Sequence, residues 1–131
     1  MVLSCDNISS LEMTKAGLFN TDARGGTCIL VEHVAGSDDT VHFTAEGWGG
    51  LPELRLKLAK DKIQYALVRL AVPGQTGARS VRDVFVKWTG PAVDQESRSR
   101  KARYIEEARI LLKPSHASVE VTDWEEVNDE T

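Results

Sequence analysis

Residues 62–72 carry apolar side chains at both alternating sets of positions, with Ile63 and Leu67 in one set and Ala66 and Val68 in the other. Successive side chains of a strand point to opposite faces of its sheet. A strand that is apolar on both faces is typical of the centre of a sheet that has a layer of structure on each side. The segment therefore predicts a central, doubly covered strand, and the rest of the chain has to supply both layers.

The segments around this strand have the patterns of shorter strands and of helices. Alternating β-branched and apolar residues predict strands over residues 27–35, 40–45, 81–88 and 117–122, the first two forming a hairpin. Helical spacing predicts a first helix capped by Asp6 or Ser9, a short helix from Leu51 to Leu58 and a long helix from Val93 to Leu112. Loops are expected over residues 20–26 and 73–77, and a capped stub at 123–127 within an acidic tail over about 123–131. We predict the α/β class, with one domain over residues 1–131 and a central mixed sheet of about five strands sandwiched by helices.

The composition fits one ordinary globular domain. The chain has 131 residues, of which 41% are hydrophobic and 27% charged, so neither disorder nor a second domain is indicated. It contains no run of about 20 apolar residues, which predicts that no helix spans a membrane. The N-terminus lacks the basic region of a secretory signal, so Cys5 and Cys28 are expected to be reduced thiols, with Cys28 buried in a strand. We expect a monomer located in the cytoplasm.

Charge is unevenly distributed along the chain. The formal net charge is −4, but residues 79–109 hold eight Lys or Arg against five Asp or Glu, which is +3, so the remaining residues carry −7. Domains that bind nucleic acid are generally basic as a whole, so no nucleic-acid partner is expected. The pattern instead favours a basic patch that faces an acidic partner protein.

Few residues have the spacing of an active site or a metal centre. His33 and His42 flank the hairpin turn and could face each other across it, but without a further ligand they are interpreted as ordinary surface histidines. Gly47–Gly50 precede a helix, as in phosphate-binding loops, yet they lack a following Lys-Ser/Thr pair, so a sharp chain reversal is the preferred interpretation. Glu106 and Glu107 diverge by about 100° around a helix, as on a solvated face. No enzymatic activity, metal or cofactor is expected.

Four cations lie close together in the first half of the predicted long helix, at Arg98, Arg100, Lys101 and Arg103. Cations near a helix N-terminus oppose the helix dipole, at a cost of up to about 1 kcal/mol each. Departures from such local preferences are expected at functional sites. The run is therefore interpreted as a binding surface, which Arg79 and Arg82 could extend; the alternative is a solvated face that tertiary packing tolerates.

Two motifs lie between Gly49 and Val93. The first consists of Gly49-Gly50-Leu51-Pro52-Glu53-Leu54, Leu58, Asp61, Gln64-Tyr65-Ala66 and Arg69. The second is Val84-Phe85-Val86-Lys87-Trp88-Thr89-Gly90, followed by Val93. Together they resemble ADF-homology domains of the coactosin and drebrin type, whose usual forms are Gly-Gly-Leu-x-Glu-Leu, Asp-x-x-x-Tyr-Ala-x-x-Arg and Trp-x-Gly. The sequence departs from that pattern at Asp83, where the family usually has an aromatic or aliphatic residue, and this places an acid beside the proposed surface.

The resemblance implies an actin-binding domain of the ADF/cofilin family that is not an enzyme and acts at the cytoskeleton. In the family, the long helix and the basic residues before the Trp-x-Gly strand face actin. The corresponding positions here are Arg79, Arg82, Lys87, Arg98, Arg100, Lys101 and Arg103. Coactosin-like members bind along filaments, so filamentous actin is the expected partner in preference to monomers. Two alternatives stay open: an interaction adaptor on the same fold that has lost actin binding, and an ADF/cofilin-like factor that binds monomers or severs filaments.

Overall fold

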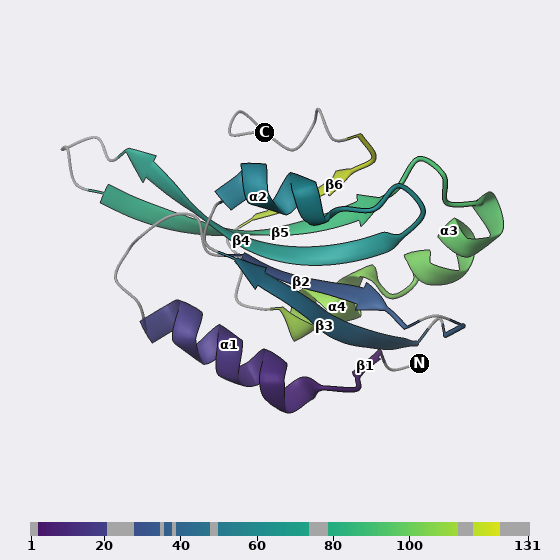
Figure 1. The fold of residues 1–131 in the computed structure, drawn as a ribbon, viewed down its shortest axis with the longest axis horizontal. Coiled ribbons are helices and arrows are strands. Elements are labelled where there is room, and N and C mark those ends of the chain that lie inside the picture. Colours follow the sequence, from purple (N-terminus) through teal and green to yellow (C-terminus); the bar gives the residue numbers. More distant parts are fainter. Residues whose placement is uncertain are drawn as a thin grey trace.

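The computed structural model describes residues 3–20, 28–34, 36–37, 39–47, 50–73, 79–112 and 117–123. In chain order these residues form β1 (Ser4–Cys5), α1 (Ile8–Asn20), β2 (Cys28–His33), β3 (Thr40–Gly47), α2 (Gly50–Lys57), β4 (Ile63–Pro73), β5 (Arg79–Thr89), α3 (Gln95–Ala102), α4 (Ile105–Leu111) and β6 (Ala117–Val121). Within this part of the chain, six strands form one sheet in the order β1-β3-β2-β4-β5-β6, with β1 parallel to β3, β6 parallel to β5 and the other pairs antiparallel (Figure 1). The α/β class and the mixed sheet are confirmed, with six strands in place of about five.

Helices cover both faces of the sheet. α1 and α4 lie on one face and α2 lies on the other (Figure 1). β4 runs between β2 and β5 and is buried on both faces, as predicted. Its Tyr65 and Leu67 join the core beneath α1 and α4, while Ala66 and Val68 join the core beneath α2. The sheet therefore separates two cores.

The leucine stripe predicted for the short helix builds the α2 side. Leu51, Leu54 and Leu58 are buried in the same core as Trp88 of β5. The Trp88 indole N–H also donates to the backbone carbonyl of Ala59 at 2.7 Å. This bond satisfies the only polar group of the buried indole and ties β5 to the segment that follows α2.

β1 has no signal in the sequence because it contains only two residues. It pairs with the outer edge of β3, and Ser4 donates its backbone N–H to the carbonyl of Asp39 at 2.9 Å. The backbone N–H of Leu3 donates to a carboxylate oxygen of Glu107 in α4, also at 2.9 Å. Glu107, predicted to lie on a solvated face, is thus partly buried and holds the start of the chain against α4.

The predicted long helix is in fact two helices, which corrects the expectation from the sequence. α3 ends at Ala102 and α4 begins at Ile105, with a turn between them (Figure 1). In that turn, the Tyr104 N–H donates to the carbonyl of Lys101, three residues back, and the Tyr104 side chain is 5% exposed. α3 buries none of its side chains, and after Val93 the next apolar residue that packs against the core beneath α1 and α4 is Tyr104. The chain turns where α3 ends and contact with this core resumes.

This break reverses the argument from the helix dipole. Arg100 and Lys101 lie in the last turn of α3, while Glu106 and Glu107 lie in the first turn of α4. Cations near a helix C-terminus and anions near an N-terminus are the favoured arrangement. The cations therefore stabilise α3, and the hypothesis that they break a local rule is wrong. A role for them has to be argued from their position on the surface.

Most other expectations for the elements are confirmed. β2 and β3 form the predicted hairpin, and β6 turns Val121 into the core beneath α2. Cys5 and Cys28 are free thiols, and burial raises the pKa of the Cys28 thiol to about 11. α1 runs through Asn20, the first residue of a predicted loop. Residues 21–26, 74–77 and 124–127, which were predicted as loops and a stub, lie outside the described residues. Of the helices in the described ranges, none combines the length and apolarity that crossing a bilayer would need.

Candidate functional site

α3 is held by its N-terminal end. Asp94 is the N-cap residue, and its carboxylate accepts the backbone N–H of Ser97 at 2.7 Å. This hydrogen bond lowers the pKa of Asp94 below its ordinary value. The Arg98 guanidinium folds back and donates to the carbonyl of Val93 at 3.0 Å and to that of Gly90 at 3.3 Å. Arg98 therefore fastens the first turn of α3 to the end of β5.

The turn that precedes α3 is packed against the segment before β4. Ala92 donates its N–H to the carbonyl of Lys60 at 2.7 Å, and Gly90 donates to that of Lys62 at 3.0 Å. A Cβ atom at residue 90 would overlap the backbone of Lys60, so the close approach requires glycine. This contact explains the glycine of the Trp-x-Gly motif, and it fixes the point at which α3 leaves the sheet.

Three of the predicted site residues gather at the far end of α3. Arg100 bonds Glu96 one turn earlier at 2.9 Å, and 44% of its side chain is exposed. Lys101 is partly exposed, and Arg103 is exposed in the turn between α3 and α4. We call Arg100, Lys101 and Arg103 the basic end of α3. Arg98, predicted as a fourth member, is partly buried and bonded to backbone carbonyls instead.

The other predicted cations lie elsewhere. Lys87 is 8% exposed, and its ammonium lies 3.7 Å from a carboxylate oxygen of Glu120 in β6. Arg79 and Arg82 lie at the start of β5, whereas α3 follows the end of the same strand (Figure 1). Ten residues of strand separate Arg79 from Thr89, which is roughly 33 Å at about 3.3 Å per residue. Their side chains are outside the described part of the structure. Arg79 and Arg82 therefore do not form one continuous patch with the basic end of α3.

Asp83 is not an exposed acid beside this surface. It lies directly across from Arg69 in the β4–β5 ladder and is 2% exposed. The Arg69 guanidinium donates to its two carboxylate oxygens at 2.8 and 3.1 Å, and these hydrogen bonds raise the pKa of Arg69. The departure from the family pattern at Asp83 therefore supplies the buried partner of the motif arginine. Neither group is available to a ligand.

The histidines do not face each other across the hairpin. The register opposes His33 to Val41 and His42 to Glu32, so the two imidazoles lie in neighbouring rungs of the ladder. The Nε2 atom of His33 lies 2.7 Å from the Tyr65 hydroxyl oxygen. The Nδ1 atom of His42 lies 2.6 Å from a carboxylate oxygen of Asp6. Across the described ranges, no group of three or more His, Cys, Asp or Glu side chains converges as metal ligands would.

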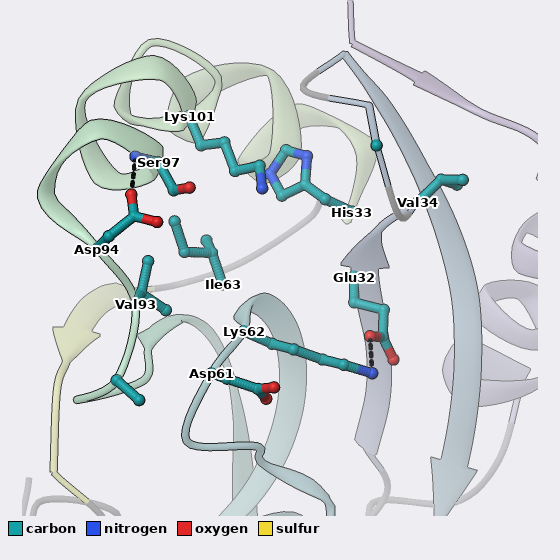
Figure 2. A pocket seen from close by; sticks show the side chains of 12 residues that line it. Glu32, His33, Val34, Asp61, Lys62, Ile63, Val93, Asp94, Ser97 and Lys101 are labelled. Atoms are coloured by element: carbon teal, nitrogen blue, oxygen red, sulfur yellow. Dashed lines mark hydrogen bonds and ion pairs between the residues drawn. The ribbon is translucent and has the colours of Figure 1, made fainter.

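A cleft of about 480 Å³ lies beside α3, between the end of β2 and the segment that precedes β4 (Figure 2). Ser97 and Lys101 line it from α3, and His33 lines it from β2. On the third side, Lys62 bonds the Glu32 carboxylate at 2.7 Å, and this hydrogen bond raises the pKa of Lys62. Sequence reasoning missed this cleft, because its residues come from three separate segments. Lys101 belongs both to the cleft and to the basic end of α3.

Comparison with known proteins places this geometry in context. Residues 18–131 match the family model of cofilin/tropomyosin-type actin-binding proteins. Coactosin from Entamoeba histolytica superposes with a TM-score of 0.79 and 16% identity, covering 98% of this chain and 89% of that one. Cofilin from Streptomyces griseoflavus gives 0.77 and 15%, covering 99% and 92%. Mouse coactosin, described as an actin filament binding protein, gives 0.71 and 12%, covering 99% and 87%. Among curated protein sequences, none matches the chain significantly. The likeness to the three structures establishes a common fold.

Proposed function

Because the chain belongs to the family of cofilin/tropomyosin-type actin-binding proteins, we propose that it binds actin at the cytoskeleton, prefers filaments to monomers and catalyses no reaction. The proposed contact is the basic end of α3, formed by Arg100, Lys101 and Arg103. Actin presents an acidic surface, to which these three cations are complementary. The function is that of a binding module that modulates filament dynamics.

The observation that supports this surface is the absence of any buried side chain in α3. Because the core requires no side chain of α3, this helix can carry residues that suit a binding partner. Its position is nevertheless fixed, because Asp94 caps it and Arg98 ties it to the carbonyls of the preceding turn. A rigid helix presents its cations without a large entropic cost on binding. Arginine adds a planar set of donors that matches a carboxylate.

The strength of the contact can be bounded from its charges. An exposed ion pair contributes about 0.2–1 kcal/mol, so three of them together contribute roughly 0.6–3 kcal/mol. Binding in the micromolar range requires about −8 kcal/mol, so apolar contact around the cations has to supply the larger part. The electrostatic part is screened by salt over about 8–10 Å. Filament binding should therefore weaken markedly, but not vanish, as salt is raised.

Two observations favour filaments over monomers. One structural neighbour, mouse coactosin, is described as an actin filament binding protein. In addition, the predicted cations fall toward opposite ends of β5, with Arg79 roughly 33 Å and Arg82 roughly 23 Å of strand from Thr89, where the turn to α3 begins. Two separated basic positions suit a partner that repeats its acidic surface, as a filament does. We include Arg79 and Arg82 in the proposal as a second contact.

Cosedimentation with filamentous actin at low and moderate salt tests the proposed function. We expect the protein to pellet with filaments at low salt and to pellet several-fold less at physiological ionic strength. Binding to monomeric actin, measured in parallel by fluorescence anisotropy, should be weaker. Absence of binding to both forms at low salt would instead support an adaptor that has kept the fold for another partner.

A further inference from the structure

The outer parts of β4 and β5 form a two-stranded ribbon. β2 pairs with β4 only as far as Val68, and β6 pairs with β5 only from Val84 onward. Among the described residues, 69–73 and 79–83 therefore pair only with each other, and we call them the outer ribbon (Figure 1). A two-stranded hairpin is only marginally stable by itself in water, so the direction of such a ribbon depends on what holds its base.

A buried ion pair occupies the first rung of the outer ribbon. Arg69 lies directly across from Asp83 in the ladder, and both side chains are buried. The guanidinium donates to both carboxylate oxygens, at 2.8 and 3.1 Å. The pair lies two residues beyond Leu67 and Phe85, on the same face of the sheet, at the edge of the core beneath α1 and α4. It therefore sits at the junction between the wider sheet and the ribbon.

Stability alone does not require an ion pair at this rung. Burial of two charges costs solvation free energy that their attraction only partly offsets, and apolar residues of similar size are often at least as stabilising. A bidentate pair adds direction, because its two parallel hydrogen bonds fix how the two side chains are oriented. It also adds register, since a slip of the ladder by two residues would separate the two buried charges.

We propose that the Arg69–Asp83 pair positions the second actin contact, because it fixes the register and direction of the outer ribbon relative to the basic end of α3. The inference rests on the proposed function, in which Arg79 and Arg82 of the ribbon form that contact. Arg79 lies four residues beyond Asp83, which is roughly 13 Å along the strand. A turn of the ribbon by about 20°, comparable to the twist between neighbouring strands, would move the backbone at Arg79 by roughly 4–5 Å. That displacement exceeds the length of a hydrogen bond, which is about 3 Å.

The first test removes the ion pair without a change in net charge. Arg69→Met combined with Asp83→Leu gives an apolar pair of similar size, whereas either single substitution would leave one buried charge without the other and risk unfolding. Amide hydrogen exchange of this apolar-pair variant requires no actin. We expect the amides of the outer ribbon to exchange about tenfold faster than in the wild type, and those of residues 64–67 in the covered part of β4 to stay unchanged.

Filament cosedimentation shows whether the pair acts on binding through the ribbon. Arg79→Ala combined with Arg82→Ala should weaken filament binding about three- to tenfold in the wild type, but less than twofold in the apolar-pair variant, where the ribbon is already displaced. Lys101→Ala is the matched control, because α3 is not part of the ribbon. Its effect should be the same factor in both backgrounds.

The two sets of substitutions separate a displaced ribbon from a loosened fold. An equal effect of the ribbon substitutions in both backgrounds, or unchanged exchange in the outer ribbon, would overturn the positioning role. So would loss of the Lys101 effect in the apolar-pair variant, because the damage would then reach α3. In each of these cases the wild type still pellets, so the proposed function stands. A wild type that fails to pellet would instead overturn the proposed function and, with it, any role of the pair in actin binding.

Discussion

α3 and α4 follow each other in the sequence and are separated by one turn, but they are held in the structure by different forces. α4 packs on the sheet through Ala108, and Tyr104 and Leu112 at its ends are buried in the same core. α3 buries no side chain and depends on its cap and on the turn that fastens it to β5. One helix belongs to the core, and the other belongs to the surface.

This difference indicates what each helix can tolerate. Substitutions that shrink a buried side chain of α4 create cavities, so their effect should be a loss in the free energy of unfolding. Charge substitutions at the basic end of α3 remove exposed or partly exposed interactions, so they should change binding and leave the fold nearly unchanged. The two helices therefore provide internal controls for each other.

The largest effect on stability is expected from Tyr104→Ala. The Tyr104 ring is 5% exposed and lies in the core beneath α1 and α4. Removal of a buried aromatic ring costs about 3–5 kcal/mol in unfolding free energy. Urea denaturation, followed by circular dichroism, measures it. A loss below 1 kcal/mol would mean that the turn between the helices contributes little to the core, and the contrast between α3 and α4 would be lost.

A smaller loss is expected from Gly90→Ala, which acts on the attachment of α3 and leaves its cations in place. The added methyl group would overlap the backbone of Lys60 and has to displace the turn before α3. Overpacking of this kind costs about 1–3 kcal/mol. Because the turn sets the direction of α3, filament affinity should fall as well, even in the folded variant. Unchanged affinity in a destabilised protein would show that the position of α3 does not matter for binding.

The smallest effect is expected from Asp94→Ala, which removes the cap of α3. The pKa of Asp94 is lowered in the folded protein by the hydrogen bond from Ser97, so the cap stabilises the fold above the ordinary carboxyl pKa of 3.8 and stops doing so as the pH falls through the lower, folded value. The urea midpoints of wild type and variant should therefore differ at pH 7 and converge in acid. A difference that is the same at pH 7 and pH 2.5 would show that the stabilisation does not come from the ionised carboxylate.

Much of the fold could be predicted from residue patterns, because burial imposes them. The two apolar faces of β4 and the leucine stripe of α2 both appear in the structure as expected. The break at Arg103 and Tyr104 escaped notice because Tyr104, Ala108 and Leu112 keep helical spacing and no Gly or Pro interrupts the segment. The charged residues do indicate the break. Cations such as Arg100 and Lys101 are typical of the last turn of a helix, and the glutamates that follow are typical of a first turn.

The candidate site was harder to predict than the fold. A sequence does not tell whether a cation is exposed, and Lys87 and Arg98 both direct their charge to groups within the protein. The distance between Arg79 and α3 was implied by the length of the strand and could have been inferred. The cleft could not, because the pairing of β2 with β4 and the turn at Gly90 bring its three walls together.

The central claim is that the basic end of α3 binds filaments and does not support the fold. The most direct test is filament cosedimentation of a variant with Arg100, Lys101 and Arg103 all changed to Glu. Its control carries two Glu substitutions on α2, at Arg55 and Lys57, and is matched in net charge by a double variant in which only Arg100 and Lys101 are changed. We expect the first variant to lose filament binding while it unfolds within about 1 kcal/mol of the wild type, and the control to pellet as the wild type does. A folded first variant that pellets undiminished, or equal losses in the two double variants, would contradict the account.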